Sequence, residues 1–446
     1  MTSPSTEQVS PQTLRKVIIA AGIGNFVEWF DFAVYGFLAT TIAQQFFPSG
    51  DASAALLKTF AVFAVAFAFR PLGGIFFGML GDRIGRKRTL AMTILLMAGA
   101  TTLIGLLPTY AAIGVAAPIL LSLIRCAQGF SAGGEYAGAC AYLMEHAPSD
   151  KRAWYGSFVP VSTFSAFAAA AVVAYALEAS LSAEAMGSWG WRLPFLIAAP
   201  LGLVGLYLRW KLDETPAFQA AKQEHAVAHS PLKETLRNHG AAICCLGAFV
   251  SLTALSFYMF TTYFATYLQV AGGLNRAMAL LVSLIALIFA AAICPLAGWY
   301  SDRVGRRVTV MTACVLLIVV VYPSFLMASS GSFAASIVGV MLLAVGAVLC
   351  GVVTAALLSE TFPTRTRYTA SAITYNMAYT LFGGTAPLVA TWLISTTGSN
   401  LSPAFYLIAV ALLALAGGLA LSETSRISLH DVGTESKDAE PVLSRY

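Results

Sequence analysis

The sequence predicts an all-α membrane protein with twelve transmembrane helices in two six-helix halves. Of its 446 residues, 58% are hydrophobic and only 11% are charged, and the mean hydropathy is +0.76. Soluble domains carry about 25% charged residues, so this chain has too little polar material to cover a surface in water. A short basic segment at residues 78–87 also returns in register at 298–307, close to half the chain later. Composition and repeat together predict two parallel copies of one membrane unit.

The apolar residues gather in twelve long stretches. Roughly 20 apolar residues span a bilayer as a helix, and helices are required because hydrocarbon offers backbone groups no partners. The stretches are continuously apolar rather than alternating, which excludes the strands of a membrane barrel. They run over residues 17–46, 59–80, 89–109, 113–143, 154–177, 192–209, 242–269, 276–299, 308–328, 333–357, 367–396 and 402–421.

The basic residues predict the orientation. Most of the 26 lysines and arginines fall on one side of these stretches. Since basic loops stay in the cytoplasm, both termini and the 210–239 loop are expected there, in a bacterial cytoplasmic membrane. The same bias explains the net charge of +5, so no nucleic-acid partner is expected. The first apolar run is too long for the core of a cleaved signal peptide.

Two further paired signatures extend the duplication, which makes three with the basic segment. Residues 145–152 and 360–367 both read E-x-x-P-x-x-x-R, and Leu212–Pro216 corresponds to Leu421–Ser425. The predicted organisation is therefore a first half over residues 1–215, a cytoplasmic linker over 216–239, a second half over 240–425 and a cytoplasmic tail over 426–446.

The repeated loop reads G-x-x-x-D-R-x-G-R-K/R in both copies. Its glycines permit a tight turn, and its aspartate can cap a helix N-terminus or pair with arginine. The alternative is a basic anchor only, but identity at each position favours a latch between helices, with a role in gating rather than in substrate binding. The predicted gating residues are Gly78, Asp82, Arg83, Gly85, Arg86, Gly298, Asp302, Arg303, Gly305, Arg306, Glu145, Arg152, Glu360 and Arg367.

Because it carries this loop twice, the chain resembles the major facilitator superfamily. Residues 24–36, 70–74, 128–136 and 189–195 resemble its metabolite:proton symporter family, and within that family the proline/glycine betaine proton symporters. The resemblance implies a secondary transporter with coupling through acids of the first and fourth helices. Two departures are the tail, which lacks a long coiled coil, and Arg125, whose surroundings also resemble carboxylate-transporting branches.

Ionisable residues inside the stretches are candidates for coupling, because they are costly in a membrane. Five stand out: Glu28, Asp31, Arg70, Arg125 and Glu135. With three acids against two bases, one carboxyl is expected to be protonated for part of the cycle, and Asp31 or Glu135 is favoured. The alternative is a set of structural ion pairs.

The second half carries aromatic rather than charged residues at the corresponding depth. Rings attract ammonium groups, and arginine holds a carboxylate, so the combination suits a zwitterion. Packing or anchoring at the membrane surface is the alternative for any single ring. The predicted substrate-binding residues are Arg125, Arg70, Trp29, Tyr258, Tyr263, Tyr375, Asn376 and Tyr379.

The predicted function is proton-coupled import of a small polar metabolite, best a compatible solute such as proline or glycine betaine. The alternative is a symporter of di- or tricarboxylates such as citrate or α-ketoglutarate, and a drug/proton exporter is more distant. No enzyme, metal or cofactor is expected, because all seven cysteines lie in apolar stretches at no metal-site spacing and none of the five histidines lies mid-span. The expected partners are the solute, protons and the lipid bilayer, and the functional unit is expected to be a monomer.

Overall fold

The computed structural model describes residues 11–84, 86–133, 150–211, 231–362 and 367–425, together with residues 136, 140, 143, 144, 147 and 148. Every regular element within these ranges is a helix. Those of the predicted first half are α1 (Pro11–Phe37), α2 (Ala39–Phe46), α3 (Ala52–Ala68), α4 (Arg70–Ile84), α5 (Arg86–Leu106), α6 (Tyr110–Ile113), α7 (Ala116–Ser131), α9 (Arg152–Gly156), α10 (Phe158–Ser180), α11 (Ala183–Ser188), η1 (Gly190–Arg192), α12 (Leu193–Leu196) and α13 (Ala198–Lys211).

The regular elements of the predicted second half are also all helices, among its described residues. They are α15 (Pro231–Tyr258), the π-helical turn η2 (Met259–Tyr263), α16 (Phe264–Val270), α17 (Arg276–Val304), α18 (Arg306–Ala328), α19 (Phe333–Glu360), α20 (Arg367–Ala378), the π-helical turn η3 (Tyr379–Gly383), α21 (Ala386–Thr397) and α22 (Ser402–Leu419). α15 begins inside the predicted linker, with Pro231 at its first position, where a missing N–H costs nothing.

The spans agree with the hydropathy prediction. The described residues contain nine helical segments long and apolar enough to cross a membrane, one pair bent by 63° (Asn25–Phe37 and Ala39–Phe46) and two shorter apolar helices, Ala91–Leu106 and Ala116–Ser131. Each of the twelve predicted stretches coincides with one of these. Large apolar side chains such as Leu106 and Leu296 are about two-thirds exposed, at 63% and 65%, as expected of a surface solvated by lipid.

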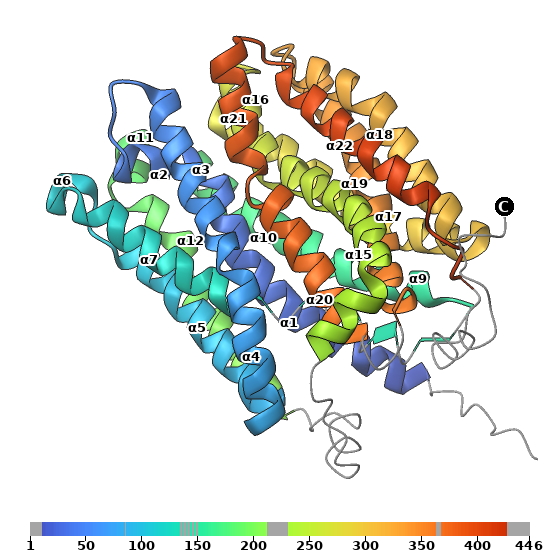
Figure 1. Ribbon diagram of the computed structural model, residues 1–446. Helices are drawn as coiled ribbons and strands as arrows, with labels where there is room; N and C mark the ends of the chain where they lie inside the picture. The colour runs from blue at the N-terminus through green and yellow to red at the C-terminus, as the bar shows by residue number, and fades with distance from the viewer. Residues whose placement is uncertain are drawn as a thin grey trace, which may run out of the picture.

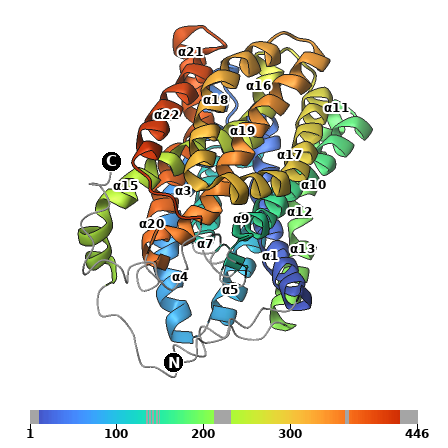
Figure 2. The same ribbon diagram turned by 90° about the vertical axis from the view of Figure 1, so that its right-hand side faces the viewer.

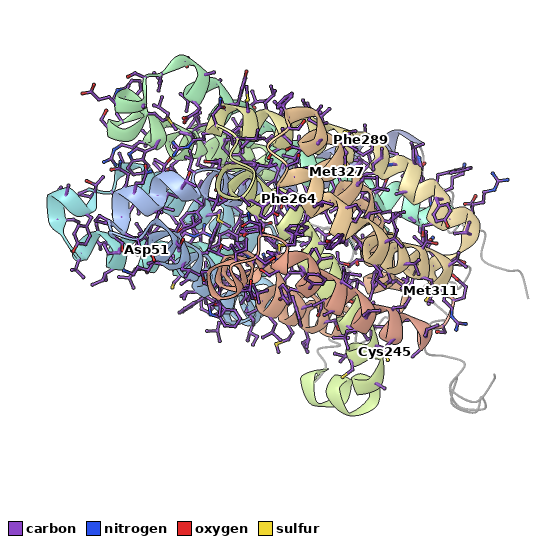
Figure 3. All side chains as sticks on the ribbon, turned by 90° about the horizontal axis from the view of Figure 1, so that it is seen from above. Asp51, Cys245, Phe264, Phe289, Met311 and Met327 are labelled. Carbon is purple, nitrogen blue, oxygen red and sulfur yellow. The ribbon has the colours of Figure 1, made fainter. Side chains whose placement is uncertain are left out.

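The helices form two groups that lie side by side. In Figure 1 the blue and teal helices α3, α4, α5 and α7 occupy one side, and α18, α19 and α22 the other. Between them α10 packs on both α1 and α17, and α4 packs on α20. Figure 2 shows the same bundle from its side, and the view from above in Figure 3 places Asp51 on the first group and Met311 on the second.

One end of the bundle carries the turn between α17 and α18 and the start of α9; we call it the basic end. α6 and α11 lie at the opposite end (Figure 1). Gly305 forms the turn with φ of +97°, a conformation that only glycine adopts without strain. The sequence predicts that the basic end faces the cytoplasm.

Close packing of α4 on α7 sets the depth of the buried arginines. A Cβ added to Gly73 would collide with the Phe130 carbonyl oxygen, and one added to Gly133 with that of Arg70. The two backbones therefore touch, which fixes Arg70 on α4 relative to Arg125 on α7.

Candidate functional site

Four charged side chains are buried within the predicted membrane stretches of the first half, among the described residues. Glu28 and Asp31 lie on α1, Arg70 begins α4, and Arg125 lies on α7; each side chain is at most 5% exposed. Burial of four ionisable groups is expensive unless they serve a function. The structure therefore brings together four of the five charges that the sequence predicted; Glu135 lies outside the described residues.

Arg125 is held by a polar chain that the sequence analysis missed. Its Nη1 donates to the Oε1 of Gln128 at 2.8 Å, and the Nε2 of Gln128 donates to the hydroxyl of Thr101 at 2.6 Å. Its guanidinium carbon lies 4.2 Å from the centre of the Tyr35 ring. Nε and Nη2 have no hydrogen-bond partner among the described residues, so two buried donors remain available to a ligand. Gln128 lies at i+3 from Arg125, a spacing that could have indicated the contact.

Arg70 has a similar environment. Its Nη2 donates to the carbonyl oxygen of Ala132 at 3.4 Å, while Nε and Nη1 find no partner in the described part of the chain. Its guanidinium carbon lies 5.3 Å from the ring centre of Phe67 and 5.8 Å from that of Phe32. The ring centre of Phe32 also lies 5.4 Å from the guanidinium carbon of Arg125, so both cations are close to the same ring.

Asp31 lies within electrostatic range of Arg125 and Glu28. The nearby hydroxyl of Thr101 donates instead to the carbonyl oxygen of Met97 at 3.0 Å. Neither carboxylate oxygen of Asp31 accepts a hydrogen bond of normal geometry from the described residues. Both oxygens can therefore take or share a proton without breaking a hydrogen bond to the described residues.

Aromatic rings from both halves meet beside the arginines. The centre of the Tyr258 ring lies 5.1 Å from that of Phe67, 6.3 Å from that of Trp29 and 6.1 Å from that of Tyr379. Tyr375 stacks on Tyr379 at 3.9 Å. The hydroxyl groups of Tyr258 and Tyr375 are buried without a hydrogen-bond partner among the described residues. Most of the predicted aromatic wall is therefore continuous with the arginine site.

Two predicted wall residues have other surroundings. Asn376 donates from Nδ2 to the carbonyl oxygen of Gly133 at 3.0 Å, and so joins α20 to the segment just beyond α7. Tyr263 packs against Phe60 and Tyr267, with ring centres about 6 Å apart, further along the chain than Tyr258. Sequence reasoning missed Phe32, Phe63 and Phe67, although the last two are at i, i+4 on α3 and face the site together.

Each aromatic helix of the second half carries a π-helical turn at the site. η2 begins directly after Tyr258, and η3 begins at Tyr379. A π turn inserts an extra residue into a helix and is common at functional sites. The rings of Tyr258 and Tyr379 lie 6.1 Å apart where these two turns begin.

The second copy of the repeated loop forms a latch between the halves. The two carboxylate oxygens of Asp302 accept hydrogen bonds from the backbone N–H groups of Ala153 and Trp154, at 2.9 and 2.8 Å. These groups are unpaired donors at the start of α9, where a carboxylate is favoured. Arg306 donates to Asp302 at 2.9 Å and to Glu360 through Nε at 3.0 Å. One buried arginine thus connects α17, α18 and α19.

Glu360 and Glu423 extend the latch. Arg152 of the first half lies 3.8 Å from Glu360, and Thr424 donates to the same carboxylate at 2.9 Å. Glu423 accepts from the backbone N–H groups of Arg306 and Arg307 at 2.8 and 3.0 Å. Burial opposes the ionisation of Glu423, but these N–H groups outweigh it and hold its pKa below the usual range. The contact is therefore present at neutral pH and is lost only as the pH falls through that lowered value.

The predicted gating residues differ in their placement. Arg303 is exposed and lies over the ring of Trp299 at 5.3 Å, apart from the latch. Gly78, Asp82 and Arg83 lie in α4, Arg86 begins α5 and Arg367 begins α20, but their side chains lie outside the described part. Gly85 and Glu145 lie outside it altogether.

The halves also meet at the opposite end. Arg276 at the start of α17 pairs with Glu178 of α10 at 3.4 Å, and the hydroxyl of Thr40 lies 3.5 Å from the Oε1 of Gln269. Contacts at both ends enclose the arginine and aromatic residues between them.

Replacing Gly298 by alanine is expected to open the latch. A Cβ at this position would lie 2.6 Å from the carbonyl oxygen of Ala153 and 2.8 Å from the Cα of Trp154, so α17 and α9 must separate. Overpacking costs about 1–3 kcal/mol, which corresponds to roughly 10- to 100-fold faster hydrogen exchange of the Ala153 and Trp154 amides. Mass spectrometry of peptides covering 152–156 measures this. The matched control is Gly99→Ala, where a Cβ meets nothing within 4 Å; equal exchange in the two variants would contradict the prediction.

Comparison with known proteins identifies the family. The Major Facilitator Superfamily matches residues 21–387 and again 278–442. The chain belongs to this superfamily. It is 38% identical to the proline/betaine transporter of Salmonella typhimurium over 97% of this chain and 89% of that protein. It is 38% identical, with the same coverage, to the glycine betaine/proline/ectoine/pipecolic acid transporter OusA of Dickeya dadantii. It is 36% identical to the ectoine/proline transporter ProP of Corynebacterium glutamicum over 100% of this chain and 92% of that protein.

Solved structures agree on the fold. The proton:xylose symporter XylE superposes with a TM-score of 0.74 at 16% identity, covering 96% of this chain and 99% of that one. Its partially occluded inward-open form gives 0.72 at 18% identity, over 93% and 99% of the two chains. Three predictions are therefore confirmed. They are the family resemblance, the all-α fold of a multi-pass membrane protein, and a transporter rather than an enzyme.

Proposed function

We propose that the protein imports a zwitterionic compatible solute, of the proline or betaine class, together with protons. One observation carries this proposal: two buried guanidinium groups with N–H donors free of described partners lie beside a cluster of aromatic rings from both halves. The names of the relatives support the same solute class, since each includes proline, betaine or ectoine.

The two ends of such a solute match the two kinds of group. Arginine binds a carboxylate through charge-assisted hydrogen bonds, and the free donors of Arg125 and Arg70 suit one carboxylate. The positive nitrogen of the solute would lie against the faces of Tyr258 and Trp29, where cation–π attraction contributes about 0.5–2 kcal/mol. The π turns at both aromatic helices allow these rings to close on the solute.

A di- or tricarboxylate remains the second candidate, because both arginines offer free donors. Against it, the buried carboxyls of Asp31 and Glu28 interact with each other and, for Asp31, with Arg125, and so can offset the two positive charges. A multiply charged anion would require more uncompensated positive charge than the described residues provide.

Proton coupling is assigned to the acids of the first half. Asp31, near Arg125, would take up a proton from the outer side and release it after the solute leaves Arg125. The latch of Asp302, Arg306 and Glu360 would re-form at the basic end in each cycle. This proposal includes three further points. Both termini lie in the cytoplasm of a bacterium, the two halves cover residues 1–215 and 240–425, and the functional unit is a monomer.

Uptake into proteoliposomes tests the function. Labelled betaine, proline and citrate are offered to the purified protein with an imposed pH gradient, acid outside. Concentrative uptake of betaine or proline that collapses with a protonophore is expected. Accumulation of citrate alone would overturn the solute class, and betaine uptake indifferent to the gradient would overturn symport.

Removing the Tyr258 ring is expected to weaken solute binding. Tyr258→Ala should raise the KM for betaine roughly 3- to 30-fold, the equivalent of one cation–π contact, whereas Tyr258→Phe keeps the ring and should stay near wild type. Tyr322→Ala serves as a control, since that ring is 40% exposed on the outer surface of α18. A KM that is unchanged in Tyr258→Ala would remove this ring from the site.

A further inference from the structure

The threonine side chains along α20, η3 and α21 make the same kind of hydrogen bond, with one exception. A threonine hydroxyl inside a helix often donates to the carbonyl oxygen four residues earlier in that helix. Among the described threonines from residue 374 to residue 397, this bond is made by Thr374, Thr385, Thr391, Thr396 and Thr397. The hydroxyl of Thr380 instead crosses to the first half and donates to the carbonyl oxygen of Phe67 at 2.9 Å.

A proline leaves the acceptor of this bond without its usual donor. In a continuous helix the carbonyl oxygen of Phe67 would accept from the N–H of residue 71, but Pro71 has none. The chain breaks here between α3 and α4, and the N–H of Phe69 at the break is shared between the carbonyl oxygens of Ala66 and Phe67. The hydroxyl of Thr380 therefore completes the hydrogen bonding of a carbonyl group that the first half does not satisfy alone.

Asn376 makes a matching contact one turn earlier. It lies four residues before Thr380, on the same face of the helix, and donates to the carbonyl oxygen of Gly133 at 3.0 Å. Gly133 directly follows Ala132, whose carbonyl oxygen accepts from Arg70 at 3.4 Å. The two donors of the second half thus bind two backbone segments that both lie next to Arg70.

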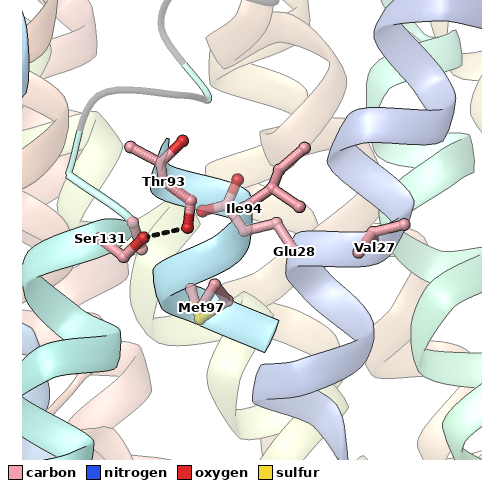
Figure 4. Close-up of a pocket in the computed structure, with 7 residues that line it drawn as sticks. Val27, Glu28, Thr93, Ile94, Met97 and Ser131 are labelled. Carbon is pink, nitrogen blue, oxygen red and sulfur yellow. Dashed lines mark hydrogen bonds between the residues drawn. The ribbon is translucent and has the colours of Figure 1, made fainter. Parts of the chain in front are cut away.

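The segment 131–133 is itself anchored within the first half. The Ser131 hydroxyl donates to the carbonyl oxygen of Thr93 on α5 at 2.6 Å, beside the small cavity drawn in Figure 4. The residues that line this cavity, Ala132 among them, all belong to the first half. Asn376 therefore docks the second half on a segment that α5 already holds.

Arg70 depends on both segments for its placement. Its one printed hydrogen bond among the described residues is the contact with Ala132, and its guanidinium carbon lies 5.3 Å from the ring centre of Phe67. Phe67 belongs to the end of α3, and Arg70 begins α4 directly after the break. The direction of the guanidinium group is therefore set by the break and by segment 131–133, and both accept a hydrogen bond from the second half.

We propose that Asn376 and Thr380 are positioning residues that set Arg70 for the solute carboxylate only when the two halves close on each other. The donors belong to one half and the acceptors to the other, so both bonds are lost wherever the halves separate here. Arg70 is then loosely placed in the open site and fixed as the site closes around the solute. Asn376 acts through Arg70 and is not itself a solute ligand. This inference rests on the proposed function.

The first test compares variants that keep or remove the donors. Thr380→Val keeps the shape of the side chain but leaves the Phe67 carbonyl short of a donor, so the KM for betaine should rise about 3- to 30-fold, with the maximal rate within about twofold. Asn376→Leu should raise the KM in the same way. Thr380→Ser keeps the hydroxyl and should restore the wild-type KM. A role in folding alone would lower protein yield and maximal rate without changing the KM.

The matched control is Thr396→Val. That hydroxyl is exposed and donates to the carbonyl oxygen of Trp392 within its own helix, at 2.7 Å, so its loss should leave the KM for betaine at the wild-type value.

Hydrogen exchange at the α3–α4 break measures the positioning without transport. The N–H of Gly73 donates to the carbonyl oxygen of Phe69 at 3.0 Å, within a peptide covering residues 66–73. Saturating betaine, which closes the halves, is expected to slow the exchange of this peptide by about 3- to 10-fold in the wild type and in Thr380→Ser. Thr380→Val should lose most of that slowing.

Three results would overturn the inference. A wild-type KM in Thr380→Val would remove the hydroxyl from the site. A higher KM in Asn376→Leu alone would make Asn376 a direct solute ligand. Exchange that betaine slows equally in the wild type and in Thr380→Val, or not at all in a wild type that takes up betaine, would show that closure does not order the break. Failure of the proposed function is distinct, because the wild-type protein would then show neither betaine uptake nor slower exchange with betaine.

Discussion

Arg125→Lys is expected to raise the KM for proline and betaine by roughly 10- to 100-fold, with protein yield and helix content unchanged. Lysine keeps the charge but loses the planar fork that binds Gln128 on one side and offers Nε and Nη2 on the other. A lost charge-assisted hydrogen bond costs about 1.5–3 kcal/mol, and each 1.4 kcal/mol is about tenfold in affinity. Initial rates of uptake at graded solute concentration measure the change.

The control is Arg303→Lys. Arg303 is exposed over Trp299 and lies apart from both the proposed solute site and the latch. The KM of this variant for proline and betaine should therefore match that of the wild type. If Arg125→Lys retained wild-type affinity for both solutes, Arg125 would have no role in carboxylate binding.

Asp31→Asn is expected to abolish accumulation driven by a pH gradient, by on the order of 100-fold or more, while counterflow continues. The amide has nearly the shape of the neutral acid, so the loaded carrier can still reorient, but it cannot release a proton. Both carboxylate oxygens of Asp31 lack a hydrogen-bond partner among the described residues, so little structural contact is lost. Uptake by this variant should also lose its dependence on external pH.

Asp51→Asn is the matched control. Asp51 is exposed and caps α3 by accepting from the N–H of Ser53 at 2.8 Å, a role that asparagine also fills. Concentrative uptake that persists in Asp31→Asn would move the coupling proton to another acid of the first half.

Much of the latch could be predicted from the sequence. Asp302, Arg306 and Glu360 are fixed by the repeated motif and its E-x-x-P-x-x-x-R partner, and the structure joins all three. The motif could not show that Arg306 joins the latch and Arg303 does not. The two arginines flank the same turn, and only the packed structure shows which of them faces the protein. Arg306 is buried and bonded to two carboxylates, whereas Arg303 lies on the surface.

The proposed solute site was predicted in part. Intramembrane charge indicated Asp31, Arg70 and Arg125, since the cost of burying charge is visible in any apolar stretch. Phe32, Phe63 and Phe67 carry no such signal, because phenylalanine is ordinary in a membrane helix. Only the packed helices show that these rings surround the two guanidinium groups.

The sequence by itself determined the apolar stretches, the repeated loop and the charges that lie within the stretches. These depend on the transfer of each segment from water to lipid, which is a local sum over neighbouring residues. Tertiary structure alone decided which side chains meet. The contacts of Asp302 with Ala153 and of the Tyr258 ring with Phe67 depend on how distant helices are rotated and how closely they pack. Glycines such as Gly73 and Gly133 permit two helix backbones to touch. Which side chains meet is therefore decided by pairs of helices rather than by any one stretch.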